Sequence, residues 1–436
     1  MNVTAPWPTI RPERWAAWPA DRRAALLTRS APDLGRTVEE TRLILERLRA
    51  DPEKELLREY GPLKPGLRLA DLRAGVGELD DAVARLPLDV AEALRLAKDN
   101  IEKFHALQLE RPMWAAEIVP GLLAGRITRP LERVGVYVPG GRAAYPSSAL
   151  MNIVPAKTAG VPRVAAATPP GPGLQARPEI LAACRLAGAD EVWKLGGAWA
   201  VGCLAYGLGG PARVDKIVGP GSSWVTAAKL AVFGQVDVDQ PAGPSEGFII
   251  ADRSADPTHL AWDFLSQLEH DPQAAAVLAT TEPALAEAVA AGVNRELPGL
   301  ERAGIVAVSL ANAAVLIVDS LEEAFELADE YAPEHLELVV ENPLSLLGRI
   351  RNAGSIFLGP WSPIPAGDYA SGPNHVLPTG GSARAFSGLS VDSFLKKMTF
   401  QQLTREALTA LAPTVETLAR AEGLPAHAKC LAVRRA

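Results

Sequence analysis

The sequence has few cysteines and no run of residues that a membrane would bury. Its 436 residues include three cysteines, which are odd in number, scattered and free of any CxxC spacing. This pattern excludes a disulfide framework and a thiolate zinc site, and it favours a reducing compartment. No segment approaches the roughly 20 uninterrupted apolar residues of a membrane helix, and residues 1–15 lack a secretory signal pattern. We therefore expect a soluble, cytoplasmic protein with no membrane partner.

The sequence also lacks any block of lysine and arginine residues, and its formal net charge is −7. This balance argues against a nucleic acid as the main partner. Because 48% of the residues are hydrophobic, the chain can bury a large core and is predicted to form two or more domains.

Two different patterns divide the chain. From about residue 20 to 110, apolar positions recur every three or four residues, which predicts helices with polar outer faces. From Val134 onward, short apolar runs that end at Gly or Pro alternate with helical patterns. This alternation is typical of βαβ units in a mostly parallel sheet, and it predicts one α/β domain near 135–240 and a second near 244–360.

Two pairs of polar side chains lie close together in the sequence of the second α/β domain. Gln267 and His270 are one helical turn apart in LSQLEHDP, so both can face one ion, although a simple hydrogen-bonded pair also explains the spacing. Glu334 and His335 adjoin in APEHLEL, where a helix ends and a strand begins. A carboxylate beside an imidazole supplies two bases of different pKa.

Further polar residues follow in two later segments. The loop AGDYASGPNHVLPTGG holds Asp368 and His375 among glycines and prolines, and such stiffness suits the positioning of functional groups. Glu422 and His427 flank a Leu-Pro turn in EGLPAH, which alone predicts an ordinary helix end. Zinc accepts nitrogen and oxygen ligands in a tetrahedral site. One candidate set is Gln267, His270, Asp368 and His427. The spacing leaves open whether these four residues meet.

The sequence contains no GxGxxG fingerprint for a dinucleotide. The first α/β domain instead offers the Gly-rich turns VPGG, LGGA and VGPGSS, whose backbone N–H groups can hold phosphate at a helix start. Similar turns occur in α/β proteins that bind no nucleotide. The residues taken alone therefore predict an α/β enzyme and leave its cofactors open.

Seven ordered segments, from about Arg129 onward, resemble the histidinol dehydrogenase family. They are RVGVYVPGGRAAYPSSALMNIVPAKTAGV, VDKIVGPG, PAGPSEGFIIAD, LSQLEHDP, APEHLEL, AGDYASGPNHVLPT and EGLPAH. The resemblance implies NAD-linked oxidation of L-histidinol through L-histidinal to L-histidine, the last steps of histidine biosynthesis. It also implies two NAD and one Zn²⁺ per active site.

The resemblance implies a role for each matched residue. Glu334 and His335 match the acid/base pair. The implied zinc ligands are Gln267, His270, Asp368 and His427. The implied substrate contacts are Ser245, Gln267, His270, His335, Asp368, His375, Glu422 and His427. The implied NAD-site residues are Tyr137, Trp199 and Ser222. The family usually has Gln in place of Trp199 and Asn in place of Ser222, and these two departures put the cofactor geometry in question.

The resemblance further implies an α/β fold of two Rossmann-like parallel-sheet domains with helical N-terminal and C-terminal extensions, in an intertwined homodimer. The expected divisions are an N-terminal extension at 1–30, a larger α/β domain from 31–134 and 244–388, an NAD-side domain at 135–243, and a helical tail at 389–436. The larger domain would carry the zinc ligands and catalytic residues, and the tail would reach the partner subunit's site.

Three other functions remain open at this point. A relative with the same zinc and catalytic pair would oxidise another alcohol, such as a sulfonated diol. A zinc hydrolase would use Glu334 to activate metal-bound water and would need no NAD. A covalent route would use a cysteine, for which Cys430 is the candidate, because Cys184 and Cys203 lie in apolar helical patterns. A non-enzymatic binding protein has little use for so many polar residues at loop and strand ends.

Overall fold

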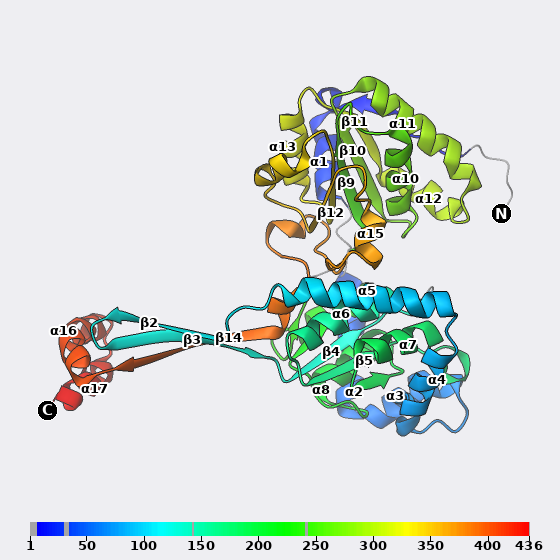
Figure 1. The fold of residues 1–436 in the computed structure, drawn as a ribbon. Helices are drawn as coiled ribbons and strands as arrows, with labels where there is room; N and C mark the ends of the chain where they lie inside the picture. Colours follow the sequence, from blue (N-terminus) through cyan, green and yellow to red (C-terminus); the bar gives the residue numbers. More distant parts are fainter. Residues whose placement is uncertain (1–6, 30–34, 142–143, 240–242, 436) are drawn as a thin grey trace.

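The structure is a computed structural model that describes residues 7–29, 35–141, 144–239 and 243–435. It contains two α/β domains, one above the other in Figure 1, and a long arm that extends from the lower domain. In the described part of the chain, no helix combines the length and the hydropathy required to cross a membrane.

The lower domain contains a five-stranded parallel sheet with the strand order β6-β5-β4-β7-β8. Its strands are short and mostly buried, which is why they occur in the sequence as continuous apolar runs. The strands are β4 (Arg133–Tyr137), β5 (Arg163–Ala167), β6 (Glu191–Trp193), β7 (Lys216–Val218) and β8 (Asp237–Val238). The intervening helices are α6 (Pro146–Thr158), α7 (Pro178–Ala187), α8 (Gly197–Tyr206) and α9 (Ser223–Val232).

The helices between residues 35 and 106 pack on this lower domain, which corrects the expected grouping of 31–134 with 244–388. They are α2 (Gly35–Ala50), α3 (Pro52–Tyr60), α4 (Val76–Ala84) and α5 (Leu88–Ala106). Leu48 and Leu56 share a core with Val201 of α8, whereas Ile101 shares one with Met151 of α6. The reason is physical: the amphipathic pattern shows which helix faces are buried but not which sheet they cover.

The upper domain contains a six-stranded parallel sheet with the strand order β1-β11-β10-β9-β12-β13. Its strands are β1 (Pro12–Arg14), β9 (Glu246–Ala251), β10 (Ala275–Thr280), β11 (Ala314–Ile317), β12 (His335–Val339) and β13 (Ser355–Leu358). Its helices are α1 (Ala20–Thr28), α10 (Pro257–Leu268), α11 (Pro283–Glu296), α12 (Ala303–Ser309), α13 (Leu321–Tyr331), α14 (Pro343–Leu346) and α15 (Ile364–Tyr369). Separate cores lie on the two faces of this sheet, so the fold has the two predicted parallel sheets.

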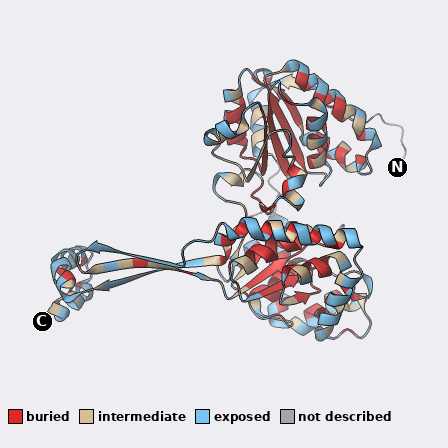
Figure 2. Cartoon of the chain, viewed as in Figure 1, coloured by how far each residue is buried: buried red, intermediate tan, exposed pale blue. Residues whose placement is uncertain are grey.

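The arm is an antiparallel sheet with the strand order β14-β3-β2, and it carries two helices at its tip (Figure 1). Its elements are β2 (Met113–Val119), β3 (Leu122–Pro130), β14 (Leu395–Leu403), α16 (Arg405–Ala421) and α17 (Pro425–Arg435). The region 389–436 was expected to be helical, but it begins with a 3₁₀ turn and strand β14. Every residue of β2 is exposed, and Figure 2 shows the arm mostly in the exposed and intermediate colours.

Candidate active site

The adjacent residues Glu334 and His335 lie at the beginning of strand β12, at the lower edge of the upper domain. Helix α13 ends in a left-handed residue, Ala332 (φ 49°), and Pro333 then leads into the pair. Both side chains are buried. Ligands in open α/β sheets usually bind at the carboxyl ends of the strands, whereas this pair lies at the amino end of its strand.

Glu334 and His335 are next to the backbone of Glu246 and the carboxylate of Asp368. Glu334 Oε2 accepts a hydrogen bond of 2.9 Å from the N–H of Glu246 and lies 3.6 Å from His335 Nδ1. Burial raises the pKa of Glu334, against the opposing effect of His335. Burial acts to lower the pKa of His335, but Glu334 and Asp368 outweigh it and the pKa is raised. Each group therefore holds a proton more tightly than it would in water.

Asp368 is brought to His335 by the short helix α15. Its Oδ1 lies 3.4 Å from His335 Nε2. Burial acts to raise the pKa of Asp368, yet His335 and the other nearby imidazoles outweigh it, so the pKa is lowered. The ring of Phe357 packs on His335 with 5.8 Å between the ring centroids. Asp368 is therefore an anionic group beside the imidazole.

Helix α10 runs back along strand β9 and delivers Gln267 and His270 to the same edge. Gln267 is 1% exposed, and both atoms of its amide are buried without a hydrogen-bond partner among the described residues. Its side chain lies over Gly247, which pairs with His335 in the sheet. Desolvation lowers the pKa of His270, and the nearby Asp368 carboxylate opposes this effect. The last turn of α10 thus presents an amide without described partners, and the bend after the helix, which ends at Leu268, presents an imidazole whose pKa is lowered.

The loop after α15 folds His375 back onto Asp368. His375 Nδ1 lies 2.8 Å from the backbone carbonyl of Asp368, and Nε2 lies 3.4 Å from Ser148 Oγ of helix α6. Because α6 belongs to the lower domain, this contact joins the two domains. Asn374 is buried and donates a hydrogen bond to the Met151 carbonyl of α6, which ties the loop to the lower domain.

The residues present fit part of a zinc site. Gln267, His270 and Asp368 converge on one edge and offer amide, imidazole and carboxylate donors, which are nitrogen and oxygen ligands of the kind that zinc accepts. No three His, Cys, Asp or Glu side chains within the described ranges lie close enough to hold an ion. The fourth predicted ligand, His427, is exposed on α17 at the tip of the arm, and so is Glu422 at the end of α16 (Figure 1). Within one chain, these two residues do not join the others.

The predicted NAD-site residues lie in the lower domain. The buried Tyr137 ends strand β4, and its hydroxyl oxygen accepts a 3.3 Å hydrogen bond from the Gly197 N–H. The half-buried Trp199 donates its indole N–H to Glu55 of helix α3 at 3.1 Å. Ser222 is exposed and precedes helix α9, where its side chain makes no capping bond. All three residues lie at the carboxyl edge of the five-stranded sheet, where parallel sheets bind ligands.

Ser245 lies on a neighbouring cavity. It lines a volume of about 610 Å³ together with Glu246 of the upper domain and Thr226 of the lower domain. Glu334 and His335 are not among the residues that line this cavity. Ser245 therefore lines a cavity that adjoins the cluster through Glu246, whose backbone N–H donates to Glu334.

Two of the three cysteines are buried and one is exposed. Burial raises the pKa of Cys184 and of Cys203 to about 12, so neither thiol is a ready nucleophile. Cys430 is exposed on α17, where Arg434 contacts its sulfur at 2.9 Å. No cysteine among the described residues lies in the Glu334–His335 cluster.

Besides Phe357, other residues without a role in the sequence patterns also contact the candidate site. Among them are Ser148, Glu246 and Arg29, of which Arg29 pairs with the Glu246 carboxylate. Glu246 had one detectable signal, an acidic residue at the start of the apolar strand GFIIA. Arg29 had none, because its partner is 217 residues away in the chain.

Two parallel sheets with a buried acid–imidazole pair at their junction define an α/β enzyme. A family model described as histidinol dehydrogenase matches residues 27–435. A histidinol dehydrogenase of Heliobacterium mobile is 51% identical over 366 residues, which cover 84% of this chain and 85% of that protein. One of Methanosarcina mazei is 47% identical over 378 residues, which cover 87% of each protein.

A solved structure supports the same assignment. The crystal structure of histidinol dehydrogenase from Elizabethkingia anophelis superposes with a TM-score of 0.89 at 37% identity, and the match covers 98% of this chain and 96% of that one. The chain belongs to the histidinol dehydrogenase family.

Proposed function

We propose that this protein catalyses the NAD-dependent oxidation of L-histidinol through L-histidinal to L-histidine, with Glu334 and His335 as its acid/base pair. Family membership supports the reaction. The observation that carries the site is the convergence of a buried carboxyl, a buried imidazole and the Asp368 carboxylate at one edge of the upper sheet. Two neighbouring proton acceptors suit two successive oxidations.

His335 is oriented to accept the proton of the alcohol. Its Nδ1 lies 3.2 Å from the Glu246 carbonyl, and because a carbonyl oxygen can only accept, this nitrogen carries the ring proton. Nε2, which lies 3.4 Å from Asp368 Oδ1, is then the nitrogen that exchanges a proton with the substrate. Nε2 would therefore take the alcohol proton, and NAD, when bound, would supply the hydride acceptor. Glu334 then helps water to attack the aldehyde before the second hydride transfer.

We assign the metal site to Gln267, His270 and Asp368 of one subunit and His427 of the other. When bound, Zn²⁺ supplies a positive centre that holds the amine and imidazole of the substrate. The amide of Gln267 is neutral and buried without partners, so it binds a cation without neutralising it. Ser245, His375 and Glu422 complete the substrate contacts, and the carboxylate of Glu422 favours the substrate ammonium.

We place NAD at the carboxyl edge of the five-stranded sheet, against Tyr137, Trp199 and Ser222. The helices α6, α8 and α9 begin at this edge, and their N-terminal amides suit phosphate. The indole N–H of Trp199 is already bonded to Glu55. Trp199 therefore offers the cofactor the face of its ring and not a hydrogen bond.

We propose that the active form is a homodimer in which the arm of each subunit reaches the other subunit's site. The arm exposes Met113, Trp114, Ile118 and Val119 of strand β2 to water. A three-stranded ribbon with such apolar exposure needs a covering surface. A second copy of the chain is the occupant that would also deliver His427 and Glu422 to the remaining ligands.

Subunit complementation tests this shared site. His270→Asn and His427→Asn are each expected to abolish turnover. When the two variants are unfolded together and refolded as a mixture, half of the dimers contain one intact site, so about one quarter of wild-type activity returns. No recovery from a mixture that forms mixed dimers would show that each subunit builds its own site.

Steady-state kinetics of the zinc-loaded protein with L-histidinol and NAD test the catalytic assignment. His335→Asn and Glu334→Gln are each expected to lower kcat by about 100-fold or more. His259→Asn, at an exposed position of helix α10, is the matched control and retains wild-type turnover. A sulfonated diol in place of histidinol tests the other substrate class. Near-normal turnover in both site variants would contradict the assigned roles.

A further inference from the structure

Glu246 lies between the two proposed catalytic side chains and contacts both through its backbone. Its N–H donates to Glu334 Oε2 at 2.9 Å, and its carbonyl accepts from His335 Nδ1 at 3.2 Å. It is the first residue of strand β9, next to β12 in the sheet. A shift of this single peptide segment therefore moves the hydrogen-bond partners of both groups together.

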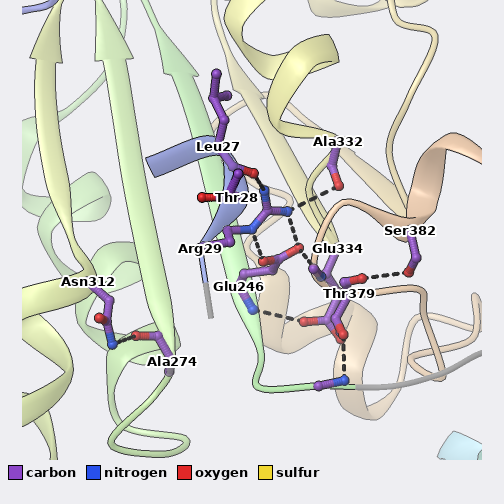
Figure 3. A network of polar contacts seen from close by, with 12 residues as sticks. Leu27, Thr28, Arg29, Glu246, Ala274, Asn312, Ala332, Glu334, Thr379 and Ser382 are labelled. Carbon is purple, nitrogen blue, oxygen red and sulfur yellow. Dashed lines mark hydrogen bonds and ion pairs between the residues drawn. The ribbon is translucent and has the colours of Figure 1, made fainter. Parts of the chain in front are cut away.

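The side chain of Glu246 is held by Arg29, which follows helix α1 (Figure 3). Arg29 Nε and Nη2 donate to the two carboxylate oxygens at 2.5 and 2.6 Å, which is the bidentate geometry of a strong ion pair. The two side chains are only 10% and 4% exposed. The N–H of Gly380 donates to the same carboxylate at 3.0 Å. The carboxylate thus has three donors and little freedom.

Arg29 also contacts the turn that leads into Glu334. Its guanidinium lies 3.5 Å from the ring centroid of Tyr331, the last residue of helix α13. Its Nη2 donates to the carbonyl of Ala332 at 3.4 Å. Arg29 therefore fixes the positions of strand β9 and of the αL turn before β12, the two segments between which the catalytic pair is held.

We propose that Arg29 and Glu246 form a clamp that positions the Glu334–His335 pair for catalysis, an inference that rests on the proposed roles of those two residues. Arg29 acts through Glu246 and the Ala332 turn, so it is a positioning residue. A buried ion pair is weak evidence for stability alone, because apolar residues of similar size often stabilise as well or better. Arg29 contacts both segments that hold the catalytic pair, strand β9 and the turn at Ala332. These contacts explain the ion pair by a positioning role in the reaction.

The test compares Arg29→Met, Arg29→Lys and Arg29→Gln. Arg29→Met is expected to lower kcat by about 10- to 100-fold, because a displacement near 1 Å costs about that much in rate. KM for histidinol should change little, because only the reacting groups move. Arg29→Lys keeps the charge but loses the two-pronged contact, so its kcat should lie between the wild type and Arg29→Met.

Arg22→Met is the matched control, because Arg22 also forms a two-pronged pair, with Glu13, and stacks on Trp18 at 3.6 Å. Arg22 lies within helix α1, which ends just before Arg29, and it does not contact Glu246 or the turn at Ala332. The kcat of Arg22→Met should therefore equal that of the wild type. If Arg29→Met does not fold, Arg29→Lys and Arg29→Gln replace it, provided that their thermal stability equals that of the wild type. A lowered kcat with an unchanged KM in these two variants is again the expected result.

A double-mutant cycle with Glu334→Gln separates the clamp from the catalytic assignment. If Arg29 acts by positioning Glu334, then Arg29→Met lowers the kcat of the Glu334→Gln protein much less than it lowers that of the wild type. An equal loss in both backgrounds, or wild-type kcat in all folded Arg29 variants, would overturn the clamp. Wild-type kcat in Glu334→Gln itself would instead overturn the role of Glu334.

Discussion

The substitution Gly247→Ala tests whether the position of Gln267 is required for activity. A Cβ at position 247 would lie 2.7 Å from Gln267 Cγ and 3.3 Å from its Cδ. Carbon atoms in contact are normally about 3.5–4.0 Å apart, so the Gln267 side chain must move by about 1 Å. Such a displacement of a proposed metal ligand is expected to lower kcat about 100-fold and to weaken zinc binding.

Three measurements on the Gly247→Ala protein check this expectation: steady-state kcat with histidinol and NAD, zinc content after gel filtration, and thermal stability. The control is Gly304→Ala in helix α12, where an added Cβ meets nothing within 4 Å. This control should keep wild-type activity and gain about 0.5–1 kcal/mol of stability, because alanine favours a helix over glycine. Wild-type kcat and zinc content in folded Gly247→Ala would refute the assignment of Gln267 as a ligand.

Three further predictions concern a hydrogen bond, a buried carboxyl and the metal. Trp199→Phe removes the bond to Glu55 and should lower the free energy of unfolding by about 1–3 kcal/mol in denaturant titrations. Burial, and after it the Asp263 carboxylate, raise the pKa of Glu337 to about 8, so the folded protein keeps a proton that the unfolded chain releases. The stabilisation by the protonated Glu337 is fully present below the ordinary carboxyl pKa and is lost as the pH rises toward 8. The free energy of unfolding of Glu337→Gln should therefore increase relative to that of the wild type between pH 5 and pH 8. A difference in unfolding free energy that stays constant with pH would contradict this. Chelation of zinc should abolish turnover reversibly and leave the circular dichroism spectrum unchanged, since both domain cores are complete without the site.

The two sheets were predictable because parallel buried strands leave a strong signal. Every residue of β9, β10 and β12 is buried, and the sequence shows them as short apolar runs between helical patterns. The attachment of α2 to α5 was not predictable, because an amphipathic helix does not specify which sheet it covers. The arm was also missed, because β14 pairs with β3 across more than 250 residues of sequence.

The candidate site could be predicted where its residues lie close together in the chain or on one motif. Gln267 with His270, and Glu334 with His335, were paired by local spacing, and the structure brings all four to one edge. His105 of helix α5 is buried and contacts the Ile101 carbonyl, and spacing alone does not report such burial. The clamp could not be predicted, because Arg29 is an unremarkable residue until the fold places it beside Glu246.

The Glu334–His335 pair lies at the amino end of its strand, where helices of the two domains point opposite ends of their dipoles toward the junction between the domains. Helix α10 ends at this edge, so the negative end of its dipole points toward the junction. Helix α6 begins at the facing edge of the lower sheet, where Ser148 in its first turn contacts His375, so the positive end of its dipole points toward the same space. One wall attracts cations and the other attracts anions. The backbone alone thus directs a cationic group toward one domain and a phosphate toward the other.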